Sequence, residues 1–409
     1  MRRLWGSPTL RTVAVYGVAG AGFAGANLIL ARVLPTTEYA VVTLVVALLN
    51  LGFSVAPAGV DGVVNRRHLE AGPRLLRQVL VPATITALLL AGTGALAYGT
   101  GPALTALTLV SILAGGALIV AAAQFQSEQR YGPSLALLQS TNIVLLLAAV
   151  VTVVTGVRDA RLPILVVAVG TVIGAVWGWT ALFRERHAKP HHDAAVPWGD
   201  ALAYAGVQAT GLLLIQLERL VLPHLLPLEA LATYGVLGAV VGSLFRVLQM
   251  GVGYSLLPRL RRAGTVAERR HLVAKEARLV SGVVVLGSAA IALIVPLVEH
   301  WFLAGKYHLT GALVLAAVAS GVAKILNAFV KATASAMADQ RELSTINAIG
   351  WVSVVIGIAG AAVGARWGLV GVIYGVAVGW LVRAVAPIWI TARHLREPVV
   401  PAVQPAGAP

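Results

Sequence analysis

Apolar stretches of about 20 residues or more constrain this chain more than any other feature, because each is long enough to cross a bilayer as one helix. Charged residues or Pro and Gly separate the stretches. The composition agrees, since 58% of the 409 residues are hydrophobic, only 11% are charged, and the mean hydropathy is +0.85. The sequence therefore predicts an all-α polytopic membrane protein with about 12 transmembrane helices, at 11–34, 39–63, 76–99, 102–125, 132–156, 162–183, 201–223, 231–256, 275–298, 310–334, 343–365 and 368–392.

The charge of the chain is explained by membrane topology. Basic residues outnumber acidic ones by 31 to 16, a formal net charge of +15. Lys and Arg gather in cytoplasmic loops of membrane proteins, and the abundance of Ala, Gly, Val and Arg points to a GC-rich bacterial genome. We therefore expect a multi-pass protein of the bacterial plasma membrane with both termini cytoplasmic, and no nucleic-acid partner. The expected outer loops then hold only Arg158, Arg161, Lys306 and Arg366.

The longest polar break in the first half, 184–200, divides the predicted helices into six plus six. The two halves also resemble each other, with Arg32 matching Arg219, Pro35 matching Pro223 and Tyr39 matching Tyr234. Six helices are an even number, so the halves are predicted to be parallel repeats related by a pseudo-two-fold axis along the membrane normal. The predicted domains are an N-terminal six-helix lobe (1–190), a cytoplasmic inter-lobe linker (191–200), a C-terminal six-helix lobe (201–394) and a disordered cytoplasmic tail (395–409).

A polar stripe lies inside the tenth predicted helix. Ser320, Lys324, Asn327, Lys331 and Ser335 follow one another at spacings of four, three, four and four residues, which places them on one helical face. A lysine near the middle of a lipid-facing helix costs roughly 2.5–3.5 kcal/mol on insertion scales. We therefore expect this face to line a wet interior.

Three cations are predicted to share one depth in that interior. Arg246, Lys324 and Arg383 each lie roughly 13–15 residues, or about 20 Å, into a helix that runs inward. The equivalent level of the N-terminal half is neutral. The predicted cavity is therefore positively charged on its C-terminal side.

The other intramembrane cations lie nearer to helix ends. Arg32 and Arg219 are close to the outer ends of their helices, and Lys331 is close to an inner end. One interpretation is that Lys331 and Arg219 are charges at the entry or exit of the cavity. The alternative is that their side chains reach the nearby membrane interface.

Two acidic residues are candidates for binding a coupling ion. Asp61 lies beyond Pro57, which should kink the second helix, and an ion pair with Arg66 or Arg67 is the alternative to ion coupling. Glu218 lies on a polar face of the seventh helix, where pairing with a neighbouring cation and binding a coupling ion are both open.

No enzymatic or cofactor motif is present. The chain has no cysteine, which excludes disulfides, thiolate metal sites and Cys nucleophiles. It also lacks a Gly-rich nucleotide loop, a Ser/His/Asp set and a paired-carboxylate motif. We expect no catalytic residues, no cofactor and no metal, and an integral-membrane glycosyltransferase or acyltransferase is not supported.

The first two predicted helices show a family resemblance. The segment ILARVLPTTEYAVVTLVVALLNLGFSVAPAGVDGVVNRR resembles the opening of Wzx-type polysaccharide flippases of the multidrug/oligosaccharidyl-lipid/polysaccharide (MOP) superfamily, where an Arg-Leu-Gly-Pro-like turn and a Glu-Tyr/Phe-Gly motif join two helices. The segments FQSEQRYGPSLALLQSTNIVLLL and MADQRELSTINAIGWVSVVIG are similar to a short inner loop and following helix of that family. Ala40 departs from the family's usual Gly, whereas Arg32, Leu34, Pro35, Glu38 and Tyr39 match.

This resemblance implies a MATE-like pair of lobes that opens alternately to the two sides of the membrane. Its expected cargo is a polyprenyl-pyrophosphate-linked glycan for surface polysaccharide biosynthesis, with membrane lipids, a polysaccharide polymerase and glycosyltransferases as partners. Alternatives are a cation-coupled multidrug exporter of the same superfamily and a lipid II-type flippase. Flippases of the lipid II type usually carry fourteen spans. The expected substrate-binding residues are Arg246, Lys324, Arg383, Asn327, Lys331, Arg219 and Arg32, and the ion-coupling candidates are Asp61 and Glu218.

Overall fold

The structure is a computed structural model that describes residues 8–67, 69–70, 72–186, 195–243, 245, 260 and 263–396. Its regular elements are helical, which confirms the predicted fold class. The first half contains α1 (Pro8–Val33), α2 (Thr36–Val55), α3 (Val60–Arg67), α4 (Pro73–Tyr98), α5 (Pro102–Ser127), α6 (Tyr131–Thr155) and α7 (Arg161–Arg186). The second half contains α8 (Trp198–Leu225), α9 (Leu228–Leu237), η1 (Gly238–Gly242), α11 (Val266–Leu297), η2 (Val298–Phe302), α12 (Gly311–Met337), α13 (Gln340–Gly364), η3 (Ala365–Trp367) and α14 (Gly368–His394).

The described helices are those of a multi-pass membrane protein. Nine helical stretches are long and apolar enough to cross a membrane, and one of them, Arg341–His394, includes both α13 and α14. Two shorter apolar helices, Gly17–Val33 and Leu228–Gly242, also lie within the described ranges, so that with α13 and α14 taken separately these ranges hold twelve apolar helices. Large apolar side chains point outward, where lipid covers them; Leu96 is 91% exposed and Leu286 is 72% exposed. The main difference from the prediction is α11, which begins at Val266 rather than at 275.

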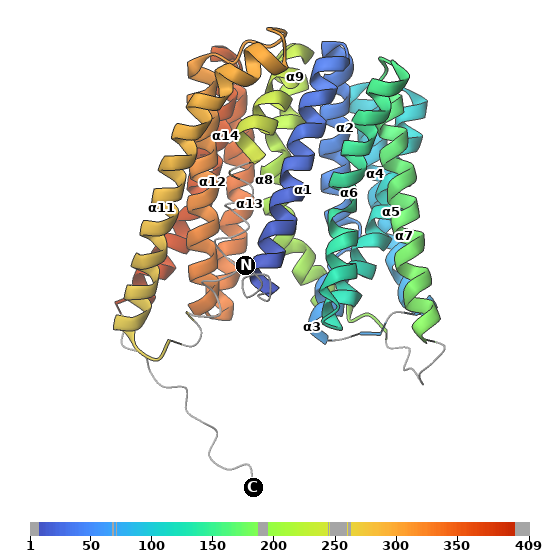
Figure 1. The fold of residues 1–409 in the computed structure, drawn as a ribbon. Coiled ribbons are helices and arrows are strands. Elements are labelled where there is room, and N and C mark those ends of the chain that lie inside the picture. The colour runs from blue at the N-terminus through green and yellow to red at the C-terminus, as the bar shows by residue number, and fades with distance from the viewer. Residues whose placement is uncertain are drawn as a thin grey trace, which may run out of the picture.

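The helices form two groups, seen side by side in Figure 1. In the N lobe (α1–α7), α1 packs on α6, and α5 packs on α4, α6 and α7. In the C lobe (α8–α14), α14 packs between α12 and α13. The start of α1 and the end of α14 lie at the same end of the bundle, here called the terminal end. The opposite, distal end carries the connections at 34–35, 99–101, 226–227 and 303–310.

Helix α8 contacts both lobes along its length. Near its start, the carbonyl of Ala201 lies so close to Gly59 that a Cβ added there would be 1.9 Å away. Midway, Thr210 and Leu217 pack on glycines of α13. Near its distal end, the Leu220 carbonyl accepts a 2.7 Å hydrogen bond from Tyr98 of α4. The helix therefore joins the two lobes as well as lining the space between them.

The second predicted span is broken, as Pro57 indicated. Helix α2 ends at Val55 and α3 begins at Val60. Between them, Ala58 and Gly59 have φ values of 49° and 79°, which lie in the left-handed region that favours glycine. Beyond this turn α3 packs on α5 and α8, the same two helices that α2 contacts before it.

The structure corrects one element of the predicted repeat. Pro35 precedes α2 with φ −52° and ψ 151°, and Pro227 precedes α9 with φ −53° and ψ 149°. These two prolines occupy equivalent positions, whereas Pro223 lies inside α8. Residues 198–200 of the predicted linker already belong to α8, while 187–194 and the tail from 397 lie outside the described residues.

Candidate functional site

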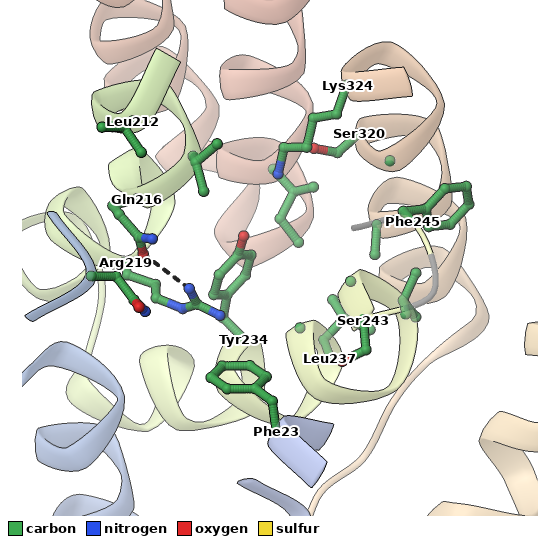
Figure 2. A pocket seen from close by; sticks show the side chains of 18 of the residues that line it. Phe23, Leu212, Gln216, Arg219, Tyr234, Leu237, Ser243, Phe245, Ser320 and Lys324 are labelled. Atoms are coloured by element: carbon green, nitrogen blue, oxygen red, sulfur yellow. Dashed lines mark hydrogen bonds between the residues drawn. The ribbon is translucent and has the colours of Figure 1, made fainter. Parts of the chain in front are cut away.

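A cavity of about 180 Å³ lies between the two lobes. The N lobe contributes Phe23 of α1, and Asn50 and Ser54 of α2, which lie four residues apart on one face of that helix. The C lobe contributes the remaining described lining residues, and Figure 2 shows the arrangement of many of them. Its polar and charged lining side chains are Gln216, Arg219, Tyr234, Ser243, Ser320 and Lys324.

Lys324 enters the cavity from α12 and forms an ion pair with Glu218 of α8. The distance from Nζ to Oε1 is 2.9 Å, and the Glu218 side chain is completely buried while that of Lys324 is 19% exposed. The Lys324 ammonium also lies 5.9 Å from the centre of the Trp380 ring, within range of a cation–π interaction. Of the two interpretations of Glu218, the structure shows pairing with a neighbouring cation.

Arg219 enters the same cavity from α8, on the other side of Tyr234 from Lys324 (Figure 2). Its Nη1 donates a 3.0 Å hydrogen bond to Gln216 Oε1, and its guanidinium lies 5.9 Å from the Tyr234 ring centre. Its Nε is buried and has no hydrogen-bond partner. Two cations and one fully buried carboxylate therefore give this part of the cavity a net charge of about +1.

Lys324 and Arg383 were predicted to lie at one depth in the membrane, but their charged groups do not lie at the same level. The Arg383 Nη2 donates a 2.9 Å hydrogen bond to Thr210 Oγ1, whereas Lys324 pairs with Glu218. These two partners are eight residues apart on α8, which is about 12 Å along the helix axis. Arg383 is 3% exposed and does not line the cavity. The third member of the predicted set, Arg246, lies outside the described residues.

Other predicted site residues also lie away from the cavity. Lys331 is half-buried on α12 and close enough to Arg383 for their charges to interact. Asn327 is 3% exposed. Arg32 is exposed at the distal end of α1, where its guanidinium lies 5.9 Å from the Phe302 ring centre.

Asp61 does not form the predicted ion pair with Arg66 or Arg67. Arg66 donates a hydrogen bond to the Tyr204 hydroxyl instead, and Arg67 pairs with Asp200. Both contacts connect α3 to α8 at the terminal end. Asp61 itself is half-buried near the start of α3.

Sequence reasoning missed several residues around the charged groups. Arg219 contacts Gln216 and Tyr234, Lys324 contacts Trp380, and Arg383 contacts Thr210. None of these four partners was predicted as a site residue. A weak signal was present, because Gln216 lies three residues before Arg219 and Trp380 three before Arg383, a spacing that shares a helical face.

At the distal end, hydrogen bonds join the two lobes. Lys306, in the segment between η2 and α12, donates hydrogen bonds to the carbonyls of Ala31 (2.8 Å) and Leu34 at the end of α1. Burial raises the pKa of Tyr307 to about 12, so its hydroxyl keeps the proton that it donates to the Ala31 carbonyl at 3.3 Å. A cation capping the carbonyls at a helix C-terminus is favoured by the helix dipole. We call these four residues the distal latch.

The fold is that of MATE-type transporters of the MOP superfamily. Over 92% of this chain and 95% of the other, it resembles an inward-facing multidrug resistance MATE family transporter with a TM-score of 0.66 and 14% sequence identity. It resembles the lipid II flippase MurJ, in an inward closed conformation, with a TM-score of 0.62 and 9% identity over 94% of this chain and 91% of the other. Its resemblance to the MATE multidrug transporter DinF-BH has a TM-score of 0.61 and 14% identity, over 94% of this chain and 95% of the other.

Comparison of the sequence alone gave no relative. No family model matches the chain, and no curated protein matches it. At identities of 9–14%, the structural likeness shows the fold.

Proposed function

We propose that this protein is a flippase that moves a polyprenyl-pyrophosphate-linked oligosaccharide across the bacterial plasma membrane by alternating access. The observation that supports this most directly is the inter-lobe cavity, in which Arg219 and Lys324 face each other across Tyr234. Two cations in a low-dielectric site attract a pyrophosphate strongly. The guanidinium can bind two phosphate oxygens at once, while the ammonium acts as a point charge.

The proposed orientation places the terminal end in the cytoplasm, following the distribution of basic residues. The distal latch then closes the side facing away from the cytoplasm. The lipid tail stays in the bilayer while the head group crosses through the cavity, so the small size of the closed cavity requires the lobes to separate for transport.

Proteoliposomes provide the test. The purified protein is reconstituted with a polyprenyl-pyrophosphate-linked, fluorescently labelled oligosaccharide, and a membrane-impermeant quencher reports how much label changes leaflet. Glu218→Gln should retain flipping, because it removes the carboxylate that competes for Lys324. Lys324→Met combined with Glu218→Gln, and separately Arg219→Gln, should reduce the rate at least tenfold.

Arg366→Gln serves as the control, because this exposed arginine lies in η3 at the distal end, away from the cavity. Unchanged flipping in the Arg219 variant and in the double variant would contradict the assignment of the head-group site. Absence of flipping by the unmodified protein would contradict the function itself.

A second candidate, a cation-coupled multidrug exporter, is favoured by one observation, the completely buried carboxylate of Glu218. In that case Glu218 releases Lys324 and binds a coupling cation in its place. The expected effects of the variants on transport are then reversed. Glu218→Gln would abolish transport of a cationic compound and leave the lipid-linked oligosaccharide unmoved. The lining cations make this candidate weaker, because a cationic drug is repelled by Arg219 and Lys324.

A further inference from the structure

A second group of cations lies inside the C lobe, away from the inter-lobe cavity. Arg383 of α14 is 3% exposed, and only one of its two terminal nitrogens is bonded, through the 2.9 Å hydrogen bond from Nη2 to Thr210. Its Nη1 is buried without a partner. A buried guanidinium without an opposite charge is strongly disfavoured, because desolvation of the ion is not compensated.

The packing of α12 on α14 brings more donors to the same place. Both helices run from the distal to the terminal end, and Lys324 of α12 lies over Trp380 of α14. Asn327 and Arg383 each lie three residues further along these two packed helices. Asn327 is also 3% exposed, and its Nδ2 donor is buried without a partner.

Lys331 adds a further positive charge one turn below Asn327. It is half-buried and interacts electrostatically with Arg383. The nearest buried carboxylate on α8 is that of Glu218, which already forms an ion pair with Lys324. Within the described residues, the group is thus rich in donors and positive charge, and it has no paired acid.

We propose that Arg383, Asn327 and Lys331 bind a small inorganic anion of the size of chloride. Such an anion accepts hydrogen bonds from N–H groups in several directions and supplies the missing negative charge. Gly211 of α8 packs closely against the guanidinium, since a Cβ added there would lie 3.3 Å from Nη2, so α8 leaves no room for a bulky occupant on that side. This site is separate from the inter-lobe cavity and does not depend on the proposed flippase activity.

The test compares thermal unfolding of the purified protein in sodium chloride and in sodium gluconate at equal ionic strength, without substrate. A ligand that binds the folded state raises the unfolding midpoint in a saturable manner. Chloride should therefore raise the midpoint of the unmodified protein. The shift should be lost in Arg383→Met, be reduced in Lys331→Gln, and persist in Arg366→Gln and in Arg219→Gln.

Bromide, which has a useful anomalous X-ray signal, gives an independent readout if Arg383→Met does not fold. A bromide peak beside Nη1 of Arg383 in crystals of the unmodified protein supports the site. Equal midpoints in the two salts, or a chloride shift that is retained in both the Arg383 and Lys331 variants, overturn the proposal. A shift that inorganic pyrophosphate produces and chloride does not, and that is lost in Arg383→Met, would mean that these residues bind the pyrophosphate of the substrate. That result also overturns the proposal.

Discussion

The ammonium of Lys324 lies 2.9 Å from a carboxylate oxygen of Glu218, although 106 residues separate them in the sequence. Each charge makes the other tolerable inside the membrane. Because the carboxylate is completely buried and the ammonium is partly exposed, the two residues are not equivalent. The pair joins α8 to α12 within the C lobe, so it keeps one wall of the cavity intact.

This asymmetry gives a prediction for stability. Lys324→Met leaves a buried carboxylate without a partner and should destabilise the protein by about 3–5 kcal/mol. Adding Glu218→Gln should recover most of that loss, because the uncompensated charge is removed. The apparent unfolding temperatures of the two single variants and the double variant in detergent test this expectation, and additive losses would contradict it.

A second prediction concerns the turn between α2 and α3. Gly59→Ala should destabilise the protein far more than Gly99→Ala, although both glycines have positive φ values, of 79° and 65°. Gly99 has open space around it, so alanine there adds only the backbone strain of about 1–2 kcal/mol. At Gly59 the new Cβ would also collide with the Ala201 carbonyl. Equal unfolding temperatures for the two variants would show that this close approach is not important.

A third prediction concerns the contact between α13 and α14. A Cβ at Gly375 would lie 2.1 Å from the Gly360 carbonyl oxygen, so the helices pack backbone to backbone. Gly375→Ala should therefore separate them and destabilise the protein by about 1–3 kcal/mol. Gly282 of α11, which has open space around it, provides the control. Gly282→Ala should be neutral or slightly stabilising, and a similar loss in both variants would be the contrary result.

The fourth prediction concerns the distal latch. Lys306→Met removes the hydrogen bonds to Ala31 and Leu34 and should shift the population toward a state in which the distal ends of the lobes are apart. The chain has no cysteine, so spin labels can be attached at Leu96→Cys and Leu315→Cys, whose native side chains are 91% and 62% exposed. The distance between the labels should lengthen or gain a second, longer component.

Lys275→Met is the matched control for the latch, because this lysine lies in α11 near the terminal end. It should leave the label distances unchanged. The same distance distribution in the Lys306 variant and in the unmodified protein would show that other distal contacts, such as that of Tyr98 with Leu220, are sufficient to hold the lobes together.

The helices were predictable from the sequence because lipid imposes a minimum length on any apolar helix. The break at Pro57 was predictable for a similarly local reason, since proline removes a backbone donor. The start of α11 was not, because its first turns are charged: Thr265 accepts a hydrogen bond from the Glu268 backbone and extends the helix into polar sequence. Hydropathy does not detect a helix of that kind.

The site was less predictable because depth along a helix gives the position of a Cα atom and not the direction of a long side chain. Lys324 and Arg383 are at similar depths in their helices, yet their charged groups bond to positions on α8 that are two turns apart. The choice of partner depends on tertiary packing. Glu218 was recognised as a candidate, but only the three-dimensional arrangement shows that it belongs to Lys324.

The attachment of α8 to both lobes has a mechanical consequence. Its first turns are held by α3 through Arg66 and Arg67 and its distal end by Tyr98 of α4, both in the N lobe, whereas its middle packs on α13 and α14 of the C lobe. When one lobe rotates against the other, the middle of this helix moves differently from its two ends, and the helix must bend or twist between them. Gly206, with open space around it, lies between the first turns and the middle of α8 and offers a place for such a bend. The first half of α8 is therefore expected to act as a flexural hinge when the lobes move.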